Sequence, residues 1–305
     1  MTNNSDYHIP VMLKECLDAL KIRPDGIYVD VTFGGGGHSS EIFKKLSDQG
    51  RLIVFDQDPD AKKNAWDAPN FNFVAANFAY ITNHLRLMGV DKVDGVLADL
   101  GVSSHQFDQE ERGFSIRGEA NLDMRMNQSG ALIATDVVNE YDEDSLLQMF
   151  RKYGEITNSR RLVDTILSAR LSEKIKTTQK LLDVVVPCAP KFKEHKYFAQ
   201  VFQAIRIEVN DEMGVLEDFL KATENVLKPE GRLVVMSYHS LEDRMVKNYM
   251  KRGDVNGKLE KDFFGNVMKP FDEVTRKPIV ASEQELELNS RARSAKLRIA
   301  ERNGE

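Results

Sequence analysis

Cysteines, long apolar runs and metal-ligand motifs are largely missing from this 305-residue sequence. Cys16 and Cys188 are its only cysteines, which argues against a disulfide framework or a cysteine-based metal site. Its six histidines show no ligand spacing, so we expect no catalytic metal. No apolar run approaches the roughly 20 residues of a membrane-spanning helix, and the N-terminus has no signal pattern. We therefore expect a cytoplasmic protein without a membrane partner.

The net charge of −6 argues at first against a nucleic-acid partner. The charge is unevenly distributed, however. Residues 151–196 contain 11 Lys and Arg against 5 Asp and Glu, and residues 290–305 contain 5 against 2. These two basic segments are compatible with RNA binding, although ordinary solvated helix surfaces explain the same counts equally well.

A run of four glycines, Gly34 to Gly37, is the most informative pattern that is present. A strand-like segment at 26–30 precedes the run, and Ser39 begins a helical pattern after it. Asp56 follows Gly34 by 22 residues, about the spacing at which nucleotide-binding α/β folds place an acid near ribose hydroxyls. A glycine run alone is more often a hinge, but this context predicts a site for an adenosine-bearing cofactor.

The spacing of the glycines also bears on which cofactor binds. Dinucleotide folds use a G-x-G-x-x-G turn, and the following helix N-terminus holds a pyrophosphate. The present run lacks that spacing, and His38 stands at the start of the helix, where a phosphate would prefer bare amides. S-adenosylmethionine has no phosphate and therefore fits better than NAD.

Strands and helices alternate along most of the chain. The helix expected at 211–227 should end at Lys228-Pro229-Glu230-Gly231. The expected strands are 26–30, 52–56, 72–75, 93–99 and 232–237. Such alternation implies a parallel sheet whose ligands bind at the carboxyl ends of its strands. The glycine loop, Asp56 and Asp99 all lie at such ends.

Residues 112–196 form an interval too long for a loop between a strand and the next helix. Helical patterns at 144–150, 159–171 and 178–185 fill much of it. We predict a helical substrate-recognition domain at 112–196, inserted into a discontinuous cofactor-binding domain of residues 1–111 and 197–305. A purely structural elaboration is the alternative.

Several sequence blocks together resemble the bacterial 16S ribosomal RNA cytosine-N4 methyltransferases, the family formerly called MraW. They run in the family's order over nearly the whole chain. The blocks are the glycine loop, Tyr7-His8-Ile9-Pro10-Val11-Met12-Leu13, Ala98-Asp99-Leu100-Gly101-Val102-Ser103-Ser104, Arg112-Gly113-Phe114-Ser115, Leu122-Asp123-Met124-Arg125-Met126, Phe202-Gln203-Ala204-Ile205-Arg206-Ile207, Ser240-Leu241-Glu242-Asp243-Arg244 and Arg293-Ser294-Ala295-Lys296-Leu297-Arg298.

The resemblance implies a Rossmann-like class I S-adenosylmethionine-dependent methyltransferase fold. It implies methyl transfer to the exocyclic N4 of one cytidine in 16S rRNA, near the decoding centre of the small ribosomal subunit. A homodimer is compatible with the sequence. The family's cofactor positions fall on Gly36, Gly37, His38, Asp56, Phe78, Asp99 and Gln106.

The chain departs from the family pattern at a few positions. Val31 stands where the family commonly has glycine, and His105 stands where it commonly has proline. Residues 117–121 also differ from the usual run. These departures affect the local loop shape and the substrate contacts, but they leave the cofactor acid and the glycine turn intact.

Amino-nitrogen methylation needs no covalent enzyme intermediate, whereas methylation at cytosine carbon 5 usually needs a cysteine nucleophile. Cys188 lies within the helical insertion, which favours a buried structural role. Asp99 is the candidate catalytic residue. We expect it to hold the cofactor or the amino group of the base, and bracing of the loop is the alternative. The Asp-Pro-Pro-Tyr type of motif is missing, so the sequence assigns no general base.

Candidate RNA contacts lie in the insertion, in the tail and after the last central strand. Tyr238 or His239 is expected to stack on the target base, which must be flipped out of any base stack. No nucleophile elbow surrounds Ser237 or Ser240, so a hydrolase is not indicated. The arginines expected to hold phosphates are Arg112, Arg125, Arg160, Arg161, Arg291, Arg293 and Arg298.

Two other functions use the same cofactor site. A methyltransferase acting on a small molecule or a protein would not need either basic segment. A non-catalytic S-adenosylmethionine sensor would bind the cofactor without turnover. The sequence alone does not identify the target nucleotide, the proton acceptor or the oligomeric state.

Overall fold

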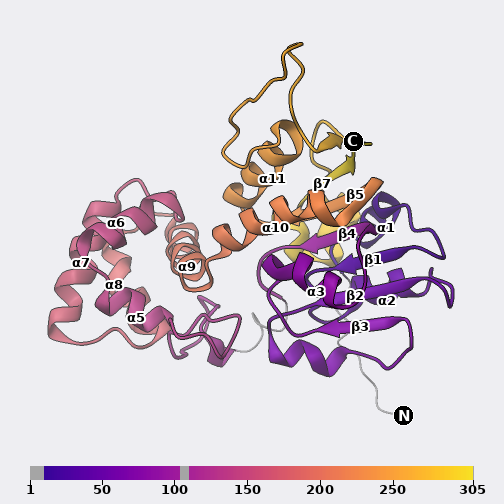
Figure 1. Cartoon of the computed structure of the whole chain (residues 1–305). Helices are drawn as coiled ribbons and strands as arrows, with labels where there is room; N and C mark the ends of the chain where they lie inside the picture. The colour runs from indigo at the N-terminus through magenta and orange to yellow at the C-terminus, as the bar shows by residue number, and fades with distance from the viewer. Residues whose placement is uncertain (1–9, 104–109, 305) are drawn as a thin grey trace. The chain divides into compact units, whose positions relative to one another are not determined.

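The computed structural model describes residues 10–103 and 110–304, which form two compact units (Figure 1). Unit 1 contains the chain up to Gly101 and from Met213 onward, and unit 2 is Val102–Glu212. The predicted insertion at 112–196 lies within unit 2, which extends further at both ends. Within the described ranges, no helix is long and apolar enough to cross a membrane.

Unit 1 is built on a seven-stranded sheet with the order β3-β2-β1-β4-β5-β7-β6. The strands are β1 (Ile27–Asp30), β2 (Arg51–Phe55), β3 (Phe71–Val74), β4 (Val93–Asp99), β5 (Leu227–Ser237), β6 (Phe271–Glu273) and β7 (Lys296–Arg302). The strand β7 runs antiparallel to its two neighbours, and the other pairs are parallel. The first four predicted strands are confirmed to within one residue at each end.

The strand β5 begins five residues earlier than predicted. Leu227 already pairs with Val93, and regular pairing resumes where Arg232 meets Gly95. Between these points the chain bulges, with Glu230 at φ 64°. The segment containing Pro229 was predicted as a turn between helix and strand, but it is a bulge inside one strand, because the residues on both sides of it pair with β4.

No strand was predicted in the C-terminal segment, yet β7 lies there, between β5 and β6 in the sheet. Its centre is buried, including Leu297, Ile299 and Ala300. Basic residues interrupt the apolar pattern, so hydrophobic periodicity alone does not predict this strand. Arg298 is accommodated because its Nε donates to Asp243 Oδ1 at 2.7 Å.

Helices cover both faces of the sheet, because neighbouring residues of one strand pack into two different apolar clusters. On β1, for example, Val29 packs with Leu216 of α10, whereas Tyr28 packs with Cys16 of α1. The helices of unit 1 are α1 (Leu13–Leu20), α2 (Gly37–Phe43), α3 (Ile81–Leu87), α10 (Glu212–Val226, whose first residue belongs to unit 2), α11 (Ser240–Arg252) and α12 (Glu283–Leu288).

Unit 2 is helical and has its own core, which includes Leu146, Phe150, Leu162 and Phe202. Its α-helices in the described range are α5 (Ala134–Glu140), α6 (Glu143–Lys152), α7 (Ser159–Ser172), α8 (Thr178–Val185) and α9 (Glu194–Asn210). The three helical patterns predicted in the insertion are therefore confirmed as α6, α7 and α8. A separate core is what a discrete helical domain requires.

Candidate functional site

Three carboxylates lie at the carboxyl ends of neighbouring strands in unit 1. Asp30 ends β1, Asp56 directly follows β2 and Asp99 ends β4. Since β1 pairs in parallel with both β2 and β4, these ends meet at one edge of the sheet. A ligand-binding cleft is expected at this edge in a parallel α/β sheet.

The loop after β1 is held by its own polar network. Asp30 is 1% exposed, and its Oδ2 accepts a 2.6 Å hydrogen bond from Ser39 Oγ. Its Oδ1 accepts from the backbone N–H of Thr32 at 3.0 Å. Thr32 Oγ1 in turn accepts from the N–H of Asp99 at 2.7 Å. The glycine loop is thus tied to the end of β4.

Two of the glycines are required by geometry. Gly36 has φ 77° and is the N-cap of α2, a conformation that residues with a Cβ rarely adopt. A Cβ on Gly37 would lie 2.4 Å from Pro10 Cγ. Gly35 is different, because a Cβ there would meet no atom within 4 Å.

Asp56 links the second strand to the glycine loop. Its Oδ2 accepts from the N–H of Gly34 at 2.8 Å, and its Oδ1 accepts from the N–H of Asp58 at 2.8 Å. Burial raises the Asp56 pKa to about 6, although these backbone hydrogen bonds oppose the rise. Each carboxylate oxygen carries a further lone pair, so Asp56 can also accept hydrogen bonds from ribose hydroxyls.

Asp99 lies close to the side chains of Tyr238 and His38 at this edge. Its Oδ1 accepts a 2.8 Å hydrogen bond from the hydroxyl of Tyr238, and its Oδ2 lies 3.8 Å from His38 Nδ1. Burial raises the Asp99 pKa to about 6, opposed by His38 and by the Tyr238 hydrogen bond. Burial also raises the pKa of Tyr238 far above its usual range, so the hydroxyl stays a neutral donor.

The donor set fits a positively charged cofactor better than a phosphorylated one. Three carboxylates lie close together at this edge and repel each other. In addition to burial, the charge of Asp30 raises the pKa of both Asp56 and Asp99. A pyrophosphate would add to this repulsion, whereas the sulfonium and ammonium groups of S-adenosylmethionine would relieve it. Asp56, Asp99 and the loop of Gly36 and Gly37 are suited to hold that cofactor.

Two other predicted cofactor residues have different outcomes. Phe78 follows β3 and is half-buried, with its ring 5.2 Å from the ring of Phe219 in a T-shaped contact. It follows the last residue of β3 by four positions and packs against the core of unit 1. Gln106 lies outside the described residues, as do Ser104 and His105.

His239 has a clear structural task in unit 1. Its Nδ1 accepts from the N–H of Glu242 at 3.4 Å, so it caps the N-terminus of α11. Glu242 Oε2 accepts in return from the N–H groups of Tyr238 and His239, at 2.8 and 3.2 Å. This capping box fixes the turn that carries the Tyr238 ring toward Asp99.

The predicted arginines of unit 2 divide into two kinds. Arg112 is 9% exposed and donates to the carbonyls of Arg125 and Met126 at 2.7 and 3.0 Å. Arg125 donates to Asp123 and to the carbonyl of Gly130. Both guanidinium groups thus brace the chain between the η3 turn (Glu110–Arg112) and α5.

Arg160 and Arg161 are exposed on α7. Arg160 lies 3.2 Å from Glu143, and Arg161 donates to the carbonyl of Pro187 at 2.8 Å. In the tail, Arg293 is exposed and Arg291 is half-buried. Arg298 is buried and bonded to Asp243. A phosphate has better access to the exposed guanidinium groups than to Arg298 or Arg112.

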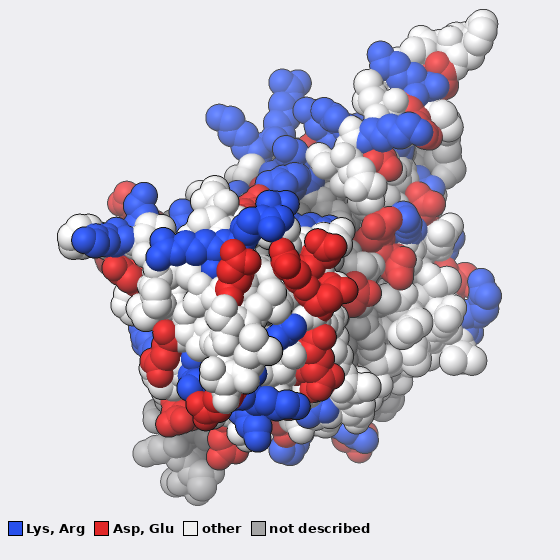
Figure 2. Space-filling model, turned by 90° about the vertical axis from the view of Figure 1, so that its left-hand side faces the viewer, with Lys and Arg blue, Asp and Glu red and all other residues white. Residues whose placement is uncertain are grey.

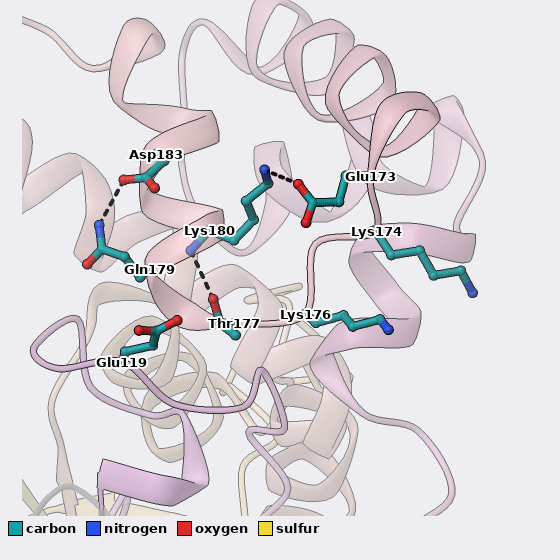
Figure 3. A pocket seen from close by; sticks show the side chains of 8 residues that line it. All are labelled: Glu119, Glu173, Lys174, Lys176, Thr177, Gln179, Lys180 and Asp183. Carbon is teal, nitrogen blue, oxygen red and sulfur yellow. Dashed lines mark hydrogen bonds and ion pairs between the residues drawn. The ribbon is translucent and has the colours of Figure 1, made fainter.

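A shallow cavity of about 570 Å³ lies in unit 2 (Figure 3). It is lined by Glu119, Glu173, Lys174, Lys176, Thr177, Gln179, Lys180 and Asp183. Lys180 pairs with Glu173, and Gln179 donates to Asp183, while Lys174 and Lys176 point away from the centre (Figure 3). Acidic and basic side chains are also interspersed on the face shown in Figure 2. The cavity is therefore balanced in charge and is not an anion pocket.

The roles of Asp30, Thr32 and Ser39 were not predicted from the sequence. A signal was present, because Asp30 stands two residues before Thr32, the spacing of an Asx turn. The predicted pair of Asp56 and Asp99 does lie at the edge expected for it. The hydrogen bond from Tyr238 to Asp99 had no local sequence signal, since the two residues are 139 positions apart.

Comparison with known proteins gives full-length matches. The model of the MraW methylase family matches residues 5–303. The protein called ribosomal RNA small subunit methyltransferase H in Bacteroides fragilis is 55% identical over 296 residues, which cover 97% of each chain. Its namesake in Cytophaga hutchinsonii is 54% identical over 298 residues, covering 97% of this chain and 99% of the relative.

Solved structures give a weaker likeness. A Streptococcus mutans protein crystallised in complex with SAH has a TM-score of 0.42 and 12% identity. The alignment covers 97% of this chain and 99% of the Streptococcus mutans chain. At this TM-score the likeness carries no weight for the site, whereas the sequence matches extend over both units.

Proposed function

Because the chain belongs to the MraW methylase family, we propose that it methylates the exocyclic N4 of a cytidine in 16S rRNA, near the decoding centre of the small ribosomal subunit. It is an S-adenosylmethionine-dependent methyltransferase. Relatives of more than 50% identity are named as methyltransferases of small-subunit ribosomal RNA. The arrangement of Asp99 and Tyr238 at the carboxyl end of the sheet is the observation that supports amino-group chemistry.

The cofactor is held by the strand ends of unit 1. In this proposal Asp56 accepts hydrogen bonds from the ribose hydroxyls, and Phe78 lines the adenine side. The turn of Gly36, Gly37 and His38 passes along the methionine part, and Gln106 is a further contact expected from the resemblance. When bound, S-adenosylmethionine supplies an electrophilic methyl group.

Asp99 orients the amino group of the target base. Its Oδ1 is engaged by the Tyr238 hydroxyl at 2.8 Å, whereas Oδ2 has His38 Nδ1 only at 3.8 Å. Oδ2 is therefore the better acceptor for an N4–H of cytosine. That hydrogen bond directs the nitrogen toward the methyl group, and Asp99 is close enough to receive the proton released from N4.

Tyr238 and His239 act on the substrate side in different ways. The Tyr238 hydroxyl fixes the carboxylate of Asp99, and the half-buried Tyr238 side chain contacts the base. His239 shapes the turn through its helix cap. Phosphates are held by the exposed arginines Arg160, Arg161 and Arg293, and Arg112, Arg125, Arg291 and Arg298 shape the surfaces around them.

The test is methyl transfer to small ribosomal subunits that lack the modification. The protein is incubated with labelled S-adenosylmethionine and such subunits, and the methylated nucleoside is identified by mass spectrometry. We expect N4-methylcytidine at one position, and its loss with the Asp99→Asn variant. Methylation of another nucleoside or of a ribosomal protein would overturn the proposed substrate, and cofactor binding without any transfer would favour a sensor.

A further inference from the structure

The segment between α11 and β6 forms a hairpin in unit 1 whose tip exposes two adjacent phenylalanines. Phe263 is 98% exposed and Phe264 is 86% exposed. Their ring centroids lie 5.7 Å apart at an interplanar angle of 86°, a T-shaped contact, which leaves at least one face of each ring uncovered by the other. The segment is seen in Figure 1 as the long loop that follows α11. Such an aromatic pair in water has an energetic cost unless it has a partner.

The tip is a built turn. The Oδ1 of Asp262 accepts from the N–H groups of Phe264 and Asn266 at 2.9 and 2.8 Å, and Asn266 Nδ2 donates to its Oδ2 at 3.0 Å. Gly265 supplies φ 88°. The backbone N–H of Asp262 also donates to the carbonyl of Asn266 at 2.9 Å. Both phenylalanines are thus presented by a turn that is already formed.

The two sides of the hairpin are paired and attached to the unit. Lys261 pairs with Val267 in an antiparallel bridge, and Met268 N–H donates to the carbonyl of Glu260 at 2.9 Å. At the base, Val255 is buried in the core beside α11. Asn248 of α11 donates to the Val255 carbonyl at 3.3 Å. The turn is therefore connected to the folded unit by hydrogen bonds and by a buried anchor.

We propose that this hairpin is an RNA-docking element, in which Phe263 and Phe264 stack on unpaired bases of the ribosomal RNA. The proposal rests on the proposed function, because it takes small-subunit rRNA as the substrate. Aromatic rings on a projecting turn are a common way to hold splayed-out bases. Stacking needs only one ring face for each base, which is what this tip offers.

Size favours RNA over a protein partner. Two phenylalanines present roughly 300–500 Å², well below the about 800 Å² that each partner buries in a specific protein interface. Lys258 pairs with Glu260, and Lys269 pairs with Asp272. Among the residues that the structure describes, Lys261 makes no ion pair, and Asp262 is occupied by the turn. Asp262 keeps its negative charge, because the hydrogen bonds that it accepts from Asn266 and the turn backbone lower its pKa. The charges of the tip therefore balance, and the aromatic rings are what the tip offers to a partner.

The test compares the double variant Phe263→Ala and Phe264→Ala with Leu87→Ala, which removes a single 83% exposed leucine from α3. Affinity for protein-free small-subunit rRNA is measured at fixed salt by filter binding. We expect the double variant to bind roughly tenfold more weakly, as the loss of base stacking predicts. Leu87→Ala should bind like the wild type. Unchanged affinity of the double variant would overturn the proposal.

A second measurement identifies what touches the tip. Phe263 is replaced with the photo-crosslinking residue p-benzoylphenylalanine, and the protein is irradiated with unmodified small subunits. We expect crosslinks to rRNA nucleotides. Crosslinks only to ribosomal proteins would overturn the proposal. The proposal would also be overturned if the wild type bound phosphatidylglycerol vesicles, and if the double substitution abolished that binding without changing rRNA affinity.

The failures of the two proposals are distinguishable. If the wild type methylates cytidine N4 and the double variant binds rRNA normally, the docking proposal fails and the proposed function stands. If the protein with p-benzoylphenylalanine at position 263 crosslinks to rRNA but the wild type methylates another nucleoside, the assigned chemistry fails and the docking element stands.

Discussion

The carboxyl edge of the sheet in unit 1 and the charged surface of unit 2 are organised in opposite ways. At the edge, Asp30, Thr32 and Asp99 are joined in one network with hydrogen bonds of 2.6 to 3.0 Å. In unit 2 the charged groups form separate pairs, such as Arg160 with Glu143 and Lys180 with Glu173. The first arrangement fixes atoms for chemistry, and the second leaves independent charges on a surface.

This difference predicts how each region responds to substitution. Groups within one network depend on each other, so single changes have large and non-additive effects. Isolated surface pairs are worth about 0–1 kcal/mol each, and their loss is felt weakly. Substitutions at the edge should therefore have larger effects than substitutions of the surface charges.

Asp99→Asn is expected to have the largest effect, a loss of about 100-fold or more in the rate of methyl transfer. The amide keeps the shape, but it cannot carry the negative charge that receives the proton from N4. Single-turnover methylation of unmodified subunits at pH 7.5 measures the rate. A rate within threefold of the wild type would show that Asp99 only braces the loop.

Asp94→Asn is the matched control, because Asp94 lies near the opposite end of the same strand. The Arg23 and Lys228 cations and the N–H of Ile27 lower the Asp94 pKa, so its charge stabilises the fold above pH 4 and this stability is lost as the pH falls. Burial raises the Asp99 pKa, so stability falls as the pH rises through about 4 to 6. At pH 7.5, Asp94→Asn should lower the free energy of unfolding, whereas Asp99→Asn should not.

Gly37→Ala should lower the free energy of unfolding by about 1–3 kcal/mol, because its Cβ would lie 2.4 Å from the stiff ring of Pro10. Gly35→Ala is the matched control two residues earlier in the same loop, since a Cβ there would meet no atom within 4 Å. Urea unfolding of both variants without cofactor gives the comparison. Equal stability of the two would mean that the loop is not packed against Pro10 as tightly as the geometry indicates.

Tyr238→Phe should reduce transfer severalfold at pH 6–7 and much less above pH 8. Activity requires the Asp99 carboxylate, whose pKa is about 6, so the rate rises with pH through that value. The Tyr238 hydrogen bond lowers this pKa, and its loss shifts the acid limb of the pH–rate profile upward. Tyr249→Phe removes a buried hydroxyl bonded to Glu224 instead and should leave the limb in place. An identical limb in both variants would contradict the role of Tyr238.

The placement of the glycine loop, Asp56 and Asp99 at one edge of the sheet was predictable from the sequence, because its signals are local. A glycine run after a strand, and an acid where a strand ends, place Asp56 and Asp99 at the same edge once the strands are parallel. The bulge at 228–231 and the strand β7 were not predictable in this way. Both depend on pairing with strands that are distant in sequence, and pairing overrides local propensity.

The roles of individual arginines were also beyond the sequence. Arg112 and Arg161 look alike in a charge count, yet the first is buried against two carbonyl groups and the second is exposed. Which cations are free for RNA is decided by tertiary contacts. A count over residues 151–196 identifies a basic segment, but it cannot identify the contacts.

The smallest effect is expected in unit 2, from replacing both Lys174 and Lys176 with alanine. Both are exposed and point away from the cavity (Figure 3), and neither forms an ion pair with another described residue. Their loss should weaken rRNA binding only a few-fold and reduce the slope of log affinity against log salt by about 1 to 2. Lys180→Ala is the control, because Lys180 already pairs with Glu173 at 2.5 Å, and it should change the slope less. A loss of about 100-fold in rRNA affinity, or an unchanged slope, would contradict the contrast between a joined network and independent charges.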